Sequence, residues 1–275
     1  MMTSFLFFLR IGLLIGVLTI FPNSIAQTFS NQFNSSSQNK LVINRIIVGS
    51  DNFRTVKANG SNIPYKFLPV LEAVGLMTVG CTATHLGQGL VISAGHCFNA
   101  EKVKYKQGCE GIQVLWGVRE GKNPTSTSNC RQVLVLEDTK IRDYALFKVD
   151  NPPRAELPIK LDGSVPLSTR VTIFSHPFTL PLVWSGICEI RKVFRPDIPL
   201  GLIHHQCDTN PGSSGAAIID VNTLEVVGIH NGGISDGVSG MNYGTYITAT
   251  YIPTILSRAG YLPLSRRNAT SQNQR

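Results

Sequence analysis

The sequence predicts an all-β fold, a barrel or sandwich closed by one helix near the C-terminal end. Apolar runs of strand length, rich in valine, isoleucine and leucine, follow one another between turn residues. The 275 residues include 25 glycines and 15 prolines, and 43% of them are hydrophobic whereas 15% are charged. This composition excludes a disordered chain, a coiled coil or a collagen, and the length permits one large β domain.

Each expected strand is bounded by glycine, proline, asparagine or aspartate. In chain order these strands span residues 76–81, 89–93, 112–116, 132–136, 145–149, 171–175, 202–206, 216–219, 226–230 and 243–248. Residues 252–259 are the expected helix, because Pro253 suits a first helical turn.

The N-terminal end is typical of an exported precursor. The apolar run at residues 5–21 is interrupted by Arg10 and is short for a membrane span, so a retained anchor is the less favoured alternative. Small residues precede Gln27 as at a cleavage site, which predicts a signal peptide over residues 1–26. Residues 27–45 are rich in Ser, Asn and Gln and predict a removable pro-segment. The expected domain is 46–265, residues 266–275 form a polar tail, and the localisation is secreted, either extracellular or periplasmic.

Charge and cysteine content exclude several other classes. The net charge of +8 is scattered rather than gathered into a basic stripe, which argues against a nucleic-acid partner. The six cysteines form no CxxC pair, so disulfides in an oxidising compartment are the expected use. His204 and His205 lie near Asp208 in sequence, but no third ligand follows at a zinc spacing, and no metal or other cofactor is expected.

Three short segments together carry the chemistry of a serine nucleophile. They are Ser-Ala-Gly-His-Cys at residues 93–97, Arg-Asp-Tyr-Ala-Leu at 142–146 and Asn-Pro-Gly-Ser-Ser-Gly-Ala at 210–216. A serine hydroxyl attacks an amide only when a histidine takes its proton and a carboxylate orients that histidine. His96, Asp143 and Ser214 supply one candidate for each role. Ser213 is the alternative nucleophile, but the flanking glycines favour Ser214.

These segments resemble the chymotrypsin-like serine endopeptidases over about residues 46–262. In that family two cysteines bracket the histidine loop, as Cys81 and Cys97 do here, and Asp-x-Ala-Leu and Gly-x-Ser-Gly segments carry the acid and the nucleophile. The resemblance implies two six-stranded antiparallel β-barrels with the catalytic residues in the cleft between them. It also implies an acyl-enzyme mechanism, with an oxyanion hole formed by the N–H groups of Gly212 and Ser214.

The resemblance also selects among the 15 complete pairings that six cysteines allow. It implies the disulfide Cys81–Cys97. For the remaining four cysteines we expect short-range closure, which gives Cys109–Cys130 and Cys188–Cys207.

Within the family the sequence is similar to the bacterial glutamyl endopeptidases. The segments at residues 46–52, 208–209 and 227–233 resemble their mature start, the approach to their nucleophile loop and their pocket strand. This likeness implies cleavage after Glu, and less readily after Asp. His230, the Thr209 hydroxyl and a freed α-amino group would then receive the substrate carboxylate.

The sequence departs from the trypsin pattern at two positions, and several alternatives stay open. Ser213 stands where trypsin-type enzymes place the aspartate that holds their new N-terminus, so activation needs another contact. Asp208 lies six residues before Ser214, which keeps a pocket for Lys or Arg as an alternative. His230 could instead be a core histidine. The mature chain could start at Ile46 or Ile47.

The expected partners are protein or peptide substrates and an activating protease, with no stable membrane association after signal cleavage. A non-catalytic relative that binds a protein partner is the alternative from another class. The four intact residues His96, Asp143, Gly212 and Ser214 argue against it, because a binding module has no need of them all.

Overall fold

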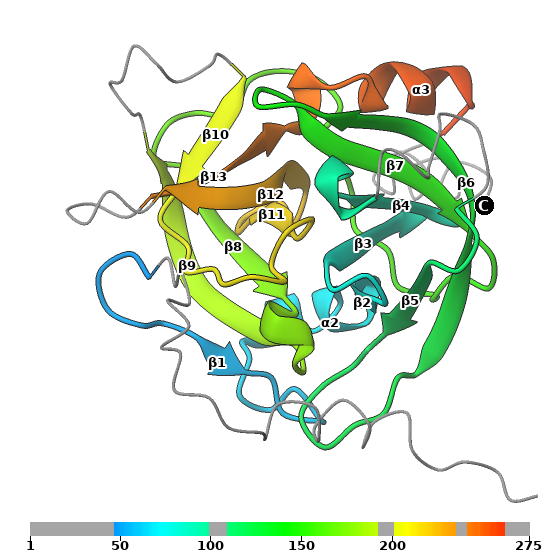
Figure 1. Cartoon of the computed structure of the whole chain (residues 1–275). Coiled ribbons are helices and arrows are strands. Elements are labelled where there is room, and N and C mark those ends of the chain that lie inside the picture. The colour runs from blue at the N-terminus through cyan, green and yellow to red at the C-terminus, as the bar shows by residue number, and fades with distance from the viewer. Residues whose placement is uncertain (1–46, 99–108, 192–200, 235–240, 262–275) are drawn as a thin grey trace, which may run out of the picture. The chain divides into compact units, whose positions relative to one another are not determined.

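The computed structural model describes residues 47–98, 109–191, 201–234 and 241–261 (Figure 1). The predicted signal peptide, pro-segment and polar tail lie outside the described residues, as does Ile46. No helix in the described ranges is both long and apolar enough to cross a membrane.

The first barrel closes in the strand order β2-β3-β4-β7-β6-β5, and each neighbouring pair is antiparallel. Along β6, buried and less buried residues alternate, because successive side chains of a strand point to opposite faces. The interior is an apolar cluster that includes Trp116, and the rings of Phe98 and Phe147 meet edge to face at 5.2 Å. The strands are β2 (Val74–Met77), β3 (Thr82–Gly87), β4 (Leu90–Ser93), β5 (Gln113–Trp116), β6 (Ser126–Asp138) and β7 (Asp143–Val149).

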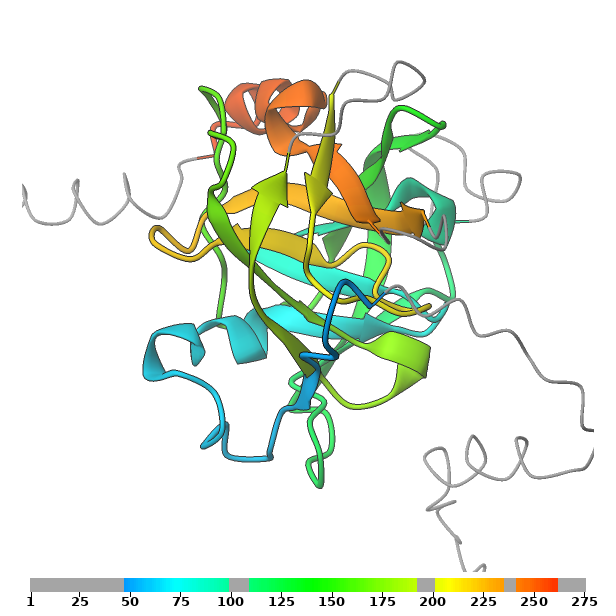
Figure 2. The same ribbon diagram turned by 90° about the vertical axis from the view of Figure 1, so that its left-hand side faces the viewer.

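The second barrel has the order β9-β10-β13-β12-β11-β8 and closes through the pairing of β8 with β9. Its neighbouring pairs are also antiparallel. At its edge the short strand β1 (Arg54–Thr55) pairs with β9, and Figure 2 shows this N-terminal segment in blue beside the second barrel. The strands are β8 (Arg170–Ser175), β9 (Val183–Arg191), β10 (Leu202–His205), β11 (Ala217–Asp220), β12 (Val226–Ile234) and β13 (Met241–Tyr246).

An apolar cluster shared by both barrels joins them. It contains Leu146 from β7 and Phe174 from β8, together with Ile252 and Leu256 from the helix α3 (Ile252–Arg258). The short helix α2 (Val70–Ala73) adds further buried residues to the same cluster. Four 3-10 turns complete the described elements: η1 (Tyr65–Phe67), η2 (Gly95–Cys97), η3 (Pro177–Thr179) and η4 (Ile247–Ala249).

The fold class is confirmed, and every expected strand overlaps an observed one. The expected strand at residues 76–81 is wrong beyond Met77, because the chain turns at residues 78–80 before β3 begins. Strands β3 and β9 were not expected. Buried threonine and histidine in β3, and glycine, cysteine and glutamate in β9, conceal the apolar pattern that identifies the other strands.

Candidate active site

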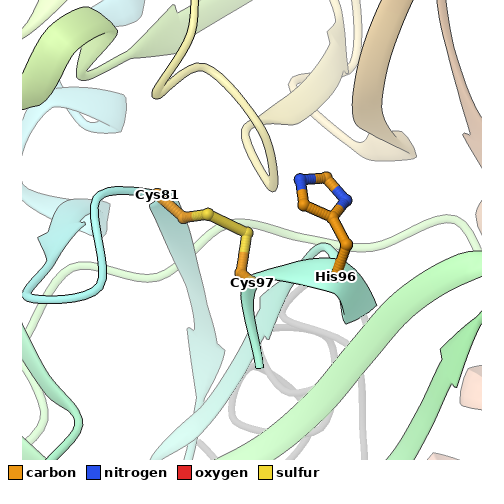
Figure 3. A group of neighbouring side chains, drawn as sticks. All are labelled: Cys81, His96 and Cys97. Carbon is orange, nitrogen blue, oxygen red and sulfur yellow. A yellow bond between two sulfur atoms is a disulfide. The ribbon is translucent and has the colours of Figure 1, made fainter. Parts of the chain in front are cut away.

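His96 lies in the 3-10 turn η2, directly after strand β4. The disulfide Cys81–Cys97 fastens this turn to the start of β3, and Figure 3 shows the His96 ring beside it. Gly95 is required at the preceding position, because a Cβ there would lie 1.9 Å from the carbonyl oxygen of Glu137 on β6. The disulfide to β3 and the close packing against β6 therefore both position the turn, independently of the contacts that His96 makes.

Asp143 accepts two hydrogen bonds from His96. Its Oδ2 lies 2.6 Å from Nδ1 of the ring, and its Oδ1 accepts the backbone N–H at 3.0 Å. Because a carboxylate only accepts, Nδ1 carries the proton and Nε2 keeps a lone pair. The hydrogen bond that His96 donates to Asp143 raises the pKa of His96 above its ordinary value, and burial opposes this shift. The His96 side chain is 37% exposed and that of Asp143 is 14% exposed, so the pair opens to solvent on the histidine side.

The loop that carries Ser214 is attached to the first barrel through Thr82. The Thr82 N–H donates to the carbonyl of Ser214 at 2.9 Å, and the Thr82 hydroxyl donates to the carbonyl of Gly212 at 2.8 Å. Gly215 packs so closely that a Cβ would lie 2.1 Å from Oγ of Ser93 and 2.4 Å from the carbonyl oxygen of Thr82. The nucleophile loop thus rests on the strands that lead to His96.

The Ser214 hydroxyl donates to the carbonyl of Asn231 at 3.3 Å. No described residue bonds to Nε2 of His96, so the expected bond between the two side chains is not formed here. Asn231 also links the barrels, because its Nδ2 donates to the carbonyl of Asp143 at 2.5 Å and its Oδ1 accepts from Thr245 at 2.8 Å. Sequence reasoning did not assign a role to Asn231, which it included only as part of the segment at residues 227–233 that resembles a pocket strand.

The N–H groups of Gly212 and Ser214 donate to no other described residue. Gly212 has a φ of +96°, and a Cβ at this position would lie 2.6 Å from the carbonyl oxygen of His176. A glycine therefore satisfies both the backbone conformation and the close approach. Two free donors beside the hydroxyl can receive a developing negative charge.

The hydroxyl of Ser213 forms hydrogen bonds within the protein. It lies 3.0 Å from the hydroxyl of Ser175 and accepts from the N–H of Asn210 at 3.3 Å. The side chain is buried, so its contacts are those of a structural residue.

Residues 81–229 match the family model of the trypsin-like peptidase domain, which is more than half of the chain. The chain belongs to the trypsin-like peptidase family. It is a chymotrypsin-like serine endopeptidase, as the resemblance implied. Among solved structures, this peptidase is similar to a Glu endopeptidase in complex with MPD, with 20% identity and a TM-score of 0.58 over 78% of this chain and 98% of that one. A comparison with the curated proteins gives no significant match.

The residues expected to bind the substrate side chain are buried in the second barrel of the peptidase. His230 lies on β12, with its Nδ1 3.2 Å from Nε2 of His205 on β10. Burial lowers the pKa of His230 to about 3, so it is neutral at physiological pH. Thr209 donates its hydroxyl proton to Oδ1 of Asn242 at 2.7 Å.

The carboxylate of Asp208 faces the N-terminal segment. Its Oδ1 accepts from the N–H of Val48 at 2.8 Å, and its Oδ2 accepts from the N–H of Asn52 at 2.7 Å. Each oxygen of the Asp208 carboxylate therefore accepts one backbone N–H group.

The structure contains the three expected disulfides, Cys81–Cys97, Cys109–Cys130 and Cys188–Cys207. His96 lies close to the first disulfide and His205 close to the third, which gives two groups of potential metal ligands among the described residues. The sulfur atoms of both groups are bonded in disulfides and supply no thiolate, so these groups do not form zinc sites.

Proposed function

We propose that the peptidase cleaves peptide bonds through Ser214, His96 and Asp143. The observation that carries this proposal is the double contact of Asp143 with His96, because it fixes the ring and the tautomer that a general base requires. The attachment of the nucleophile loop to Thr82, next to the disulfide-bound turn of His96, supports it further.

The reaction would begin with a rotation of the Ser214 hydroxyl from the Asn231 carbonyl toward Nε2 of His96. Oγ then attacks the substrate carbonyl carbon while its proton passes to Nε2, and Asp143 stabilises the imidazolium. The N–H groups of Gly212 and Ser214 receive the oxyanion. His96 next gives the proton to the leaving amine, and a water molecule repeats the sequence to release the acyl group from Oγ.

A fluorophosphonate probe tests the nucleophile directly. We expect labelling of the folded chain at Ser214, identified by peptide mass, and none in a Ser214→Ala variant. A folded and processed chain that never reacts would contradict the proposal and favour a protein-binding relative. Labelling at Ser213 would move the nucleophile by one residue.

We propose further that the peptidase prefers Glu, and less readily Asp, before the cleaved bond. The surroundings of Asp208 support this preference, because its carboxylate is buried and faces the N–H groups of Val48 and Asn52 rather than an open site for a substrate Lys or Arg. The similarity to a Glu endopeptidase is in the same direction.

A substrate carboxylate would have to recruit donors that now have other partners. The Thr209 hydroxyl would turn from Asn242 to the substrate, and His230 would exchange one of its present contacts. A negative charge close to His230 would also raise its pKa and so favour a charged partner for the carboxylate.

Digestion of a denatured proteome measures the preference, since the residue before each cut can be counted. We expect mainly Glu, with a smaller share of Asp. His230→Gln should lower the share of cuts after Glu. His204→Gln should leave that share unchanged, because His204 lies on β10 beside His205 and makes no recorded contact with His230. Cuts mainly after Lys or Arg would contradict the proposal and assign the recognition to Asp208.

We propose that the chain is exported and processed. The three disulfides support an oxidising compartment. Intact mass of the extracellular protein should show loss of residues 1–26 and then a start at Ile46 or Ile47. An intracellular chain that retains residues 1–26 would contradict this.

A further inference from the structure

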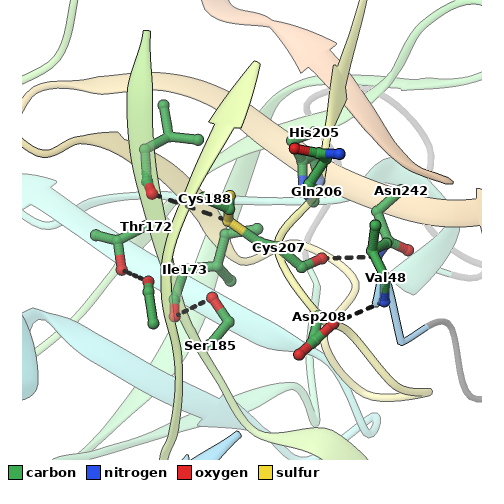
Figure 4. Close-up of a disulfide and its surroundings, with 12 residues drawn as sticks. Val48, Thr172, Ile173, Ser185, Cys188, His205, Gln206, Cys207, Asp208 and Asn242 are labelled. Atoms are coloured by element: carbon green, nitrogen blue, oxygen red, sulfur yellow. Dashed lines mark hydrogen bonds between the residues drawn. A yellow bond between two sulfur atoms is a disulfide. The ribbon is translucent and has the colours of Figure 1, made fainter. Parts of the chain in front are cut away.

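Asp208 is a buried acid with an unusual set of partners. It is 1% exposed and lies between Cys207, which is in a disulfide with Cys188, and Thr209 (Figure 4). No salt bridge among the described residues includes Asp208. Its compensation comes from the two backbone N–H groups of Val48 and Asn52.

The segment at residues 48–52 is shaped to deliver both N–H groups to one carboxylate. Gly49 has a φ of +81°, a conformation that L side chains rarely adopt. The Asn52 side chain donates to the carbonyl of Ser50 at 2.9 Å, which closes the loop. The N–H groups of Val48 and Asn52 therefore converge although three residues separate them.

Burial opposes the ionised form of Asp208. Burial raises the pKa of Asp208, and the two N–H groups only partly offset that shift. A carboxyl whose folded pKa is raised favours folding less at neutral pH than below its ordinary pKa. The ionised form of Asp208 therefore depends on the two N–H groups that face it.

The acid sits at the centre of the segment expected to contact the substrate side chain. The Asn242 side chain reaches across it, because Nδ2 donates to the carbonyl of Cys207 at 2.6 Å and Oδ1 accepts from Thr209. Figure 4 shows Val48 and Asn242 on the same side of the 207–208 backbone. The nucleophile loop begins two residues after Asp208, at Asn210.

We infer that Asp208 is a positioning residue, which clamps residues 48–52 onto residues 207–209 and so holds Thr209 for the substrate. This inference rests on the proposed function and gives Asp208 a role other than recognition of a basic side chain. The clamp uses N–H groups inside the chain rather than a new α-amino group. The clamp therefore forms before as well as after cleavage that follows residue 45 or 46. In trypsin-type enzymes, by contrast, an aspartate at the position of Ser213 binds the N-terminus that only cleavage creates.

The first test is Asp208→Asn in the processed enzyme, with its whole peptidase domain. Asn has one acceptor oxygen, and its amide would face the second N–H group, so one clamp bond is lost. We expect faster hydrogen exchange in peptides that cover residues 47–53 and 207–212. We also expect KM for a Glu peptide to rise about 10- to 100-fold, as for loss of a charged hydrogen bond, with a much smaller change in kcat.

Asp51→Asn is the matched control. It removes the same charge from an exposed neighbour in the same segment, and Asn keeps the oxygen that accepts from the N–H of Phe53. Exchange and KM should stay within about twofold of wild type. The midpoint of urea unfolding at pH 7 is measured for both variants, and exchange and KM are compared under conditions in which both stay folded, which separates positioning from a loss of folding.

A second pair of variants leaves the acid in place. Gly49→Ala should strain the segment through its φ alone, because no atom lies within 4 Å of the added Cβ. Gly121→Ala is its control, with a φ of +70° and the same free space in the first barrel. We expect Gly49→Ala to raise exchange at residues 207–212 and to increase KM, and Gly121→Ala to do neither.

Two results would overturn the inference. One is exchange in residues 207–212 that is the same in Asp208→Asn and wild type, and the other is an unchanged KM in that variant. Protection of residues 48–52 that appears only after processing would refute the claim that the clamp precedes cleavage. Hydrogen exchange requires no catalysis, and fluorophosphonate labelling of wild type reports the proposed function separately, so the two failures are distinguishable.

Discussion

The two barrels share a strand arrangement but differ in what fills them. The first has an apolar interior with the aromatic residues Phe98, Trp116 and Phe147. The buried members of the second interior cluster are aliphatic residues, alanine and cysteine, and the facing rings of His205 and His230 are buried in the same sheet. Four of the six histidines belong to this half, and burial lowers the pKa of each: His176, His204, His205 and His230.

This difference corresponds to a division of labour. The first barrel has an apolar interior and carries His96 and Asp143 near its surface. The second contains the proposed nucleophile and the buried polar groups expected to meet a substrate. Polar interiors are stable only when their groups are paired, so the second barrel should be the part that responds to pH and to small changes of contact.

The largest expected effect comes from removing the nucleophile of the second barrel. Ser214→Ala should lower kcat by about 10⁴- to 10⁶-fold, because no other hydroxyl takes its place. Ser213→Ala is the matched control and should stay within about 10-fold of wild type, since its buried hydroxyl bonds to Ser175 and to the N–H of Asn210. Steady-state hydrolysis of a peptide ester measures both, and the reverse order of effects would contradict the assignment.

The contact between the barrels can be broken at Gly215. An added Cβ would overlap Ser93 and Thr82 at a φ of +84°, so Gly215→Ala should lower the free energy of unfolding by about 4 kcal/mol. Gly111→Ala has a similar φ of +86° without a neighbouring atom and should cost about 1 kcal/mol. Urea unfolding measures both, and equal losses would show that conformation, not the inter-barrel contact, decides the cost.

Acid should weaken the second barrel through His176. Burial lowers its pKa to about 4 from 6.5, so the unfolded chain binds a proton over this range that the folded chain does not. Stability is therefore complete above pH 6.5 and falls as the pH decreases toward 4, by about 3 kcal/mol from this residue. Urea unfolding at pH 7 and at pH 4 should show a smaller difference in His176→Gln, and an unchanged difference would refute the cause.

The smallest expected effect concerns the first barrel and its base. Because Asp143 raises the pKa of His96, kcat/KM should rise with pH through a midpoint above 6.5, where the ring loses its proton. Asp138 also raises this pKa, as the weakest of the named causes, so Asp138→Asn should move the midpoint down by a fraction of a unit. A pH–rate profile measures both, and a midpoint below 6.5 in wild type would contradict the contact with Asp143.

Sequence reasoning reached the fold class because the apolar strands repeat between turn residues, and it named His96, Asp143 and Ser214 from three short segments. It missed β3, since Thr82, Thr84 and His85 are polar yet buried, and Thr82 bonds to the nucleophile loop of the second barrel. The burial of Thr82 is explained only by its contact with the second barrel, which the sequence pattern of β3 does not reveal.

The roles of Asn231 and Asp208 could not be predicted for the same reason. The Asn231 amide bonds to groups 88 and 14 residues away in the chain, and the Asp208 carboxylate bonds to N–H groups 160 and 156 residues away. Neither residue belongs to a short pattern that names its partner. An acid six residues before the nucleophile therefore kept a pocket for Lys or Arg open as an alternative, whereas its observed partners lie in the N-terminal segment.

The Cys81–Cys97 bond has a consequence for where the peptidase can act. Cys81 adjoins Thr82, whose two donors hold the nucleophile loop, and Cys97 adjoins His96. One covalent link thus secures the anchorage of the serine and that of its base. Reduction of this disulfide would loosen both residues together. We therefore expect the peptidase to be most active where thiols are oxidised. In a reducing cytosol it would digest neighbouring proteins less.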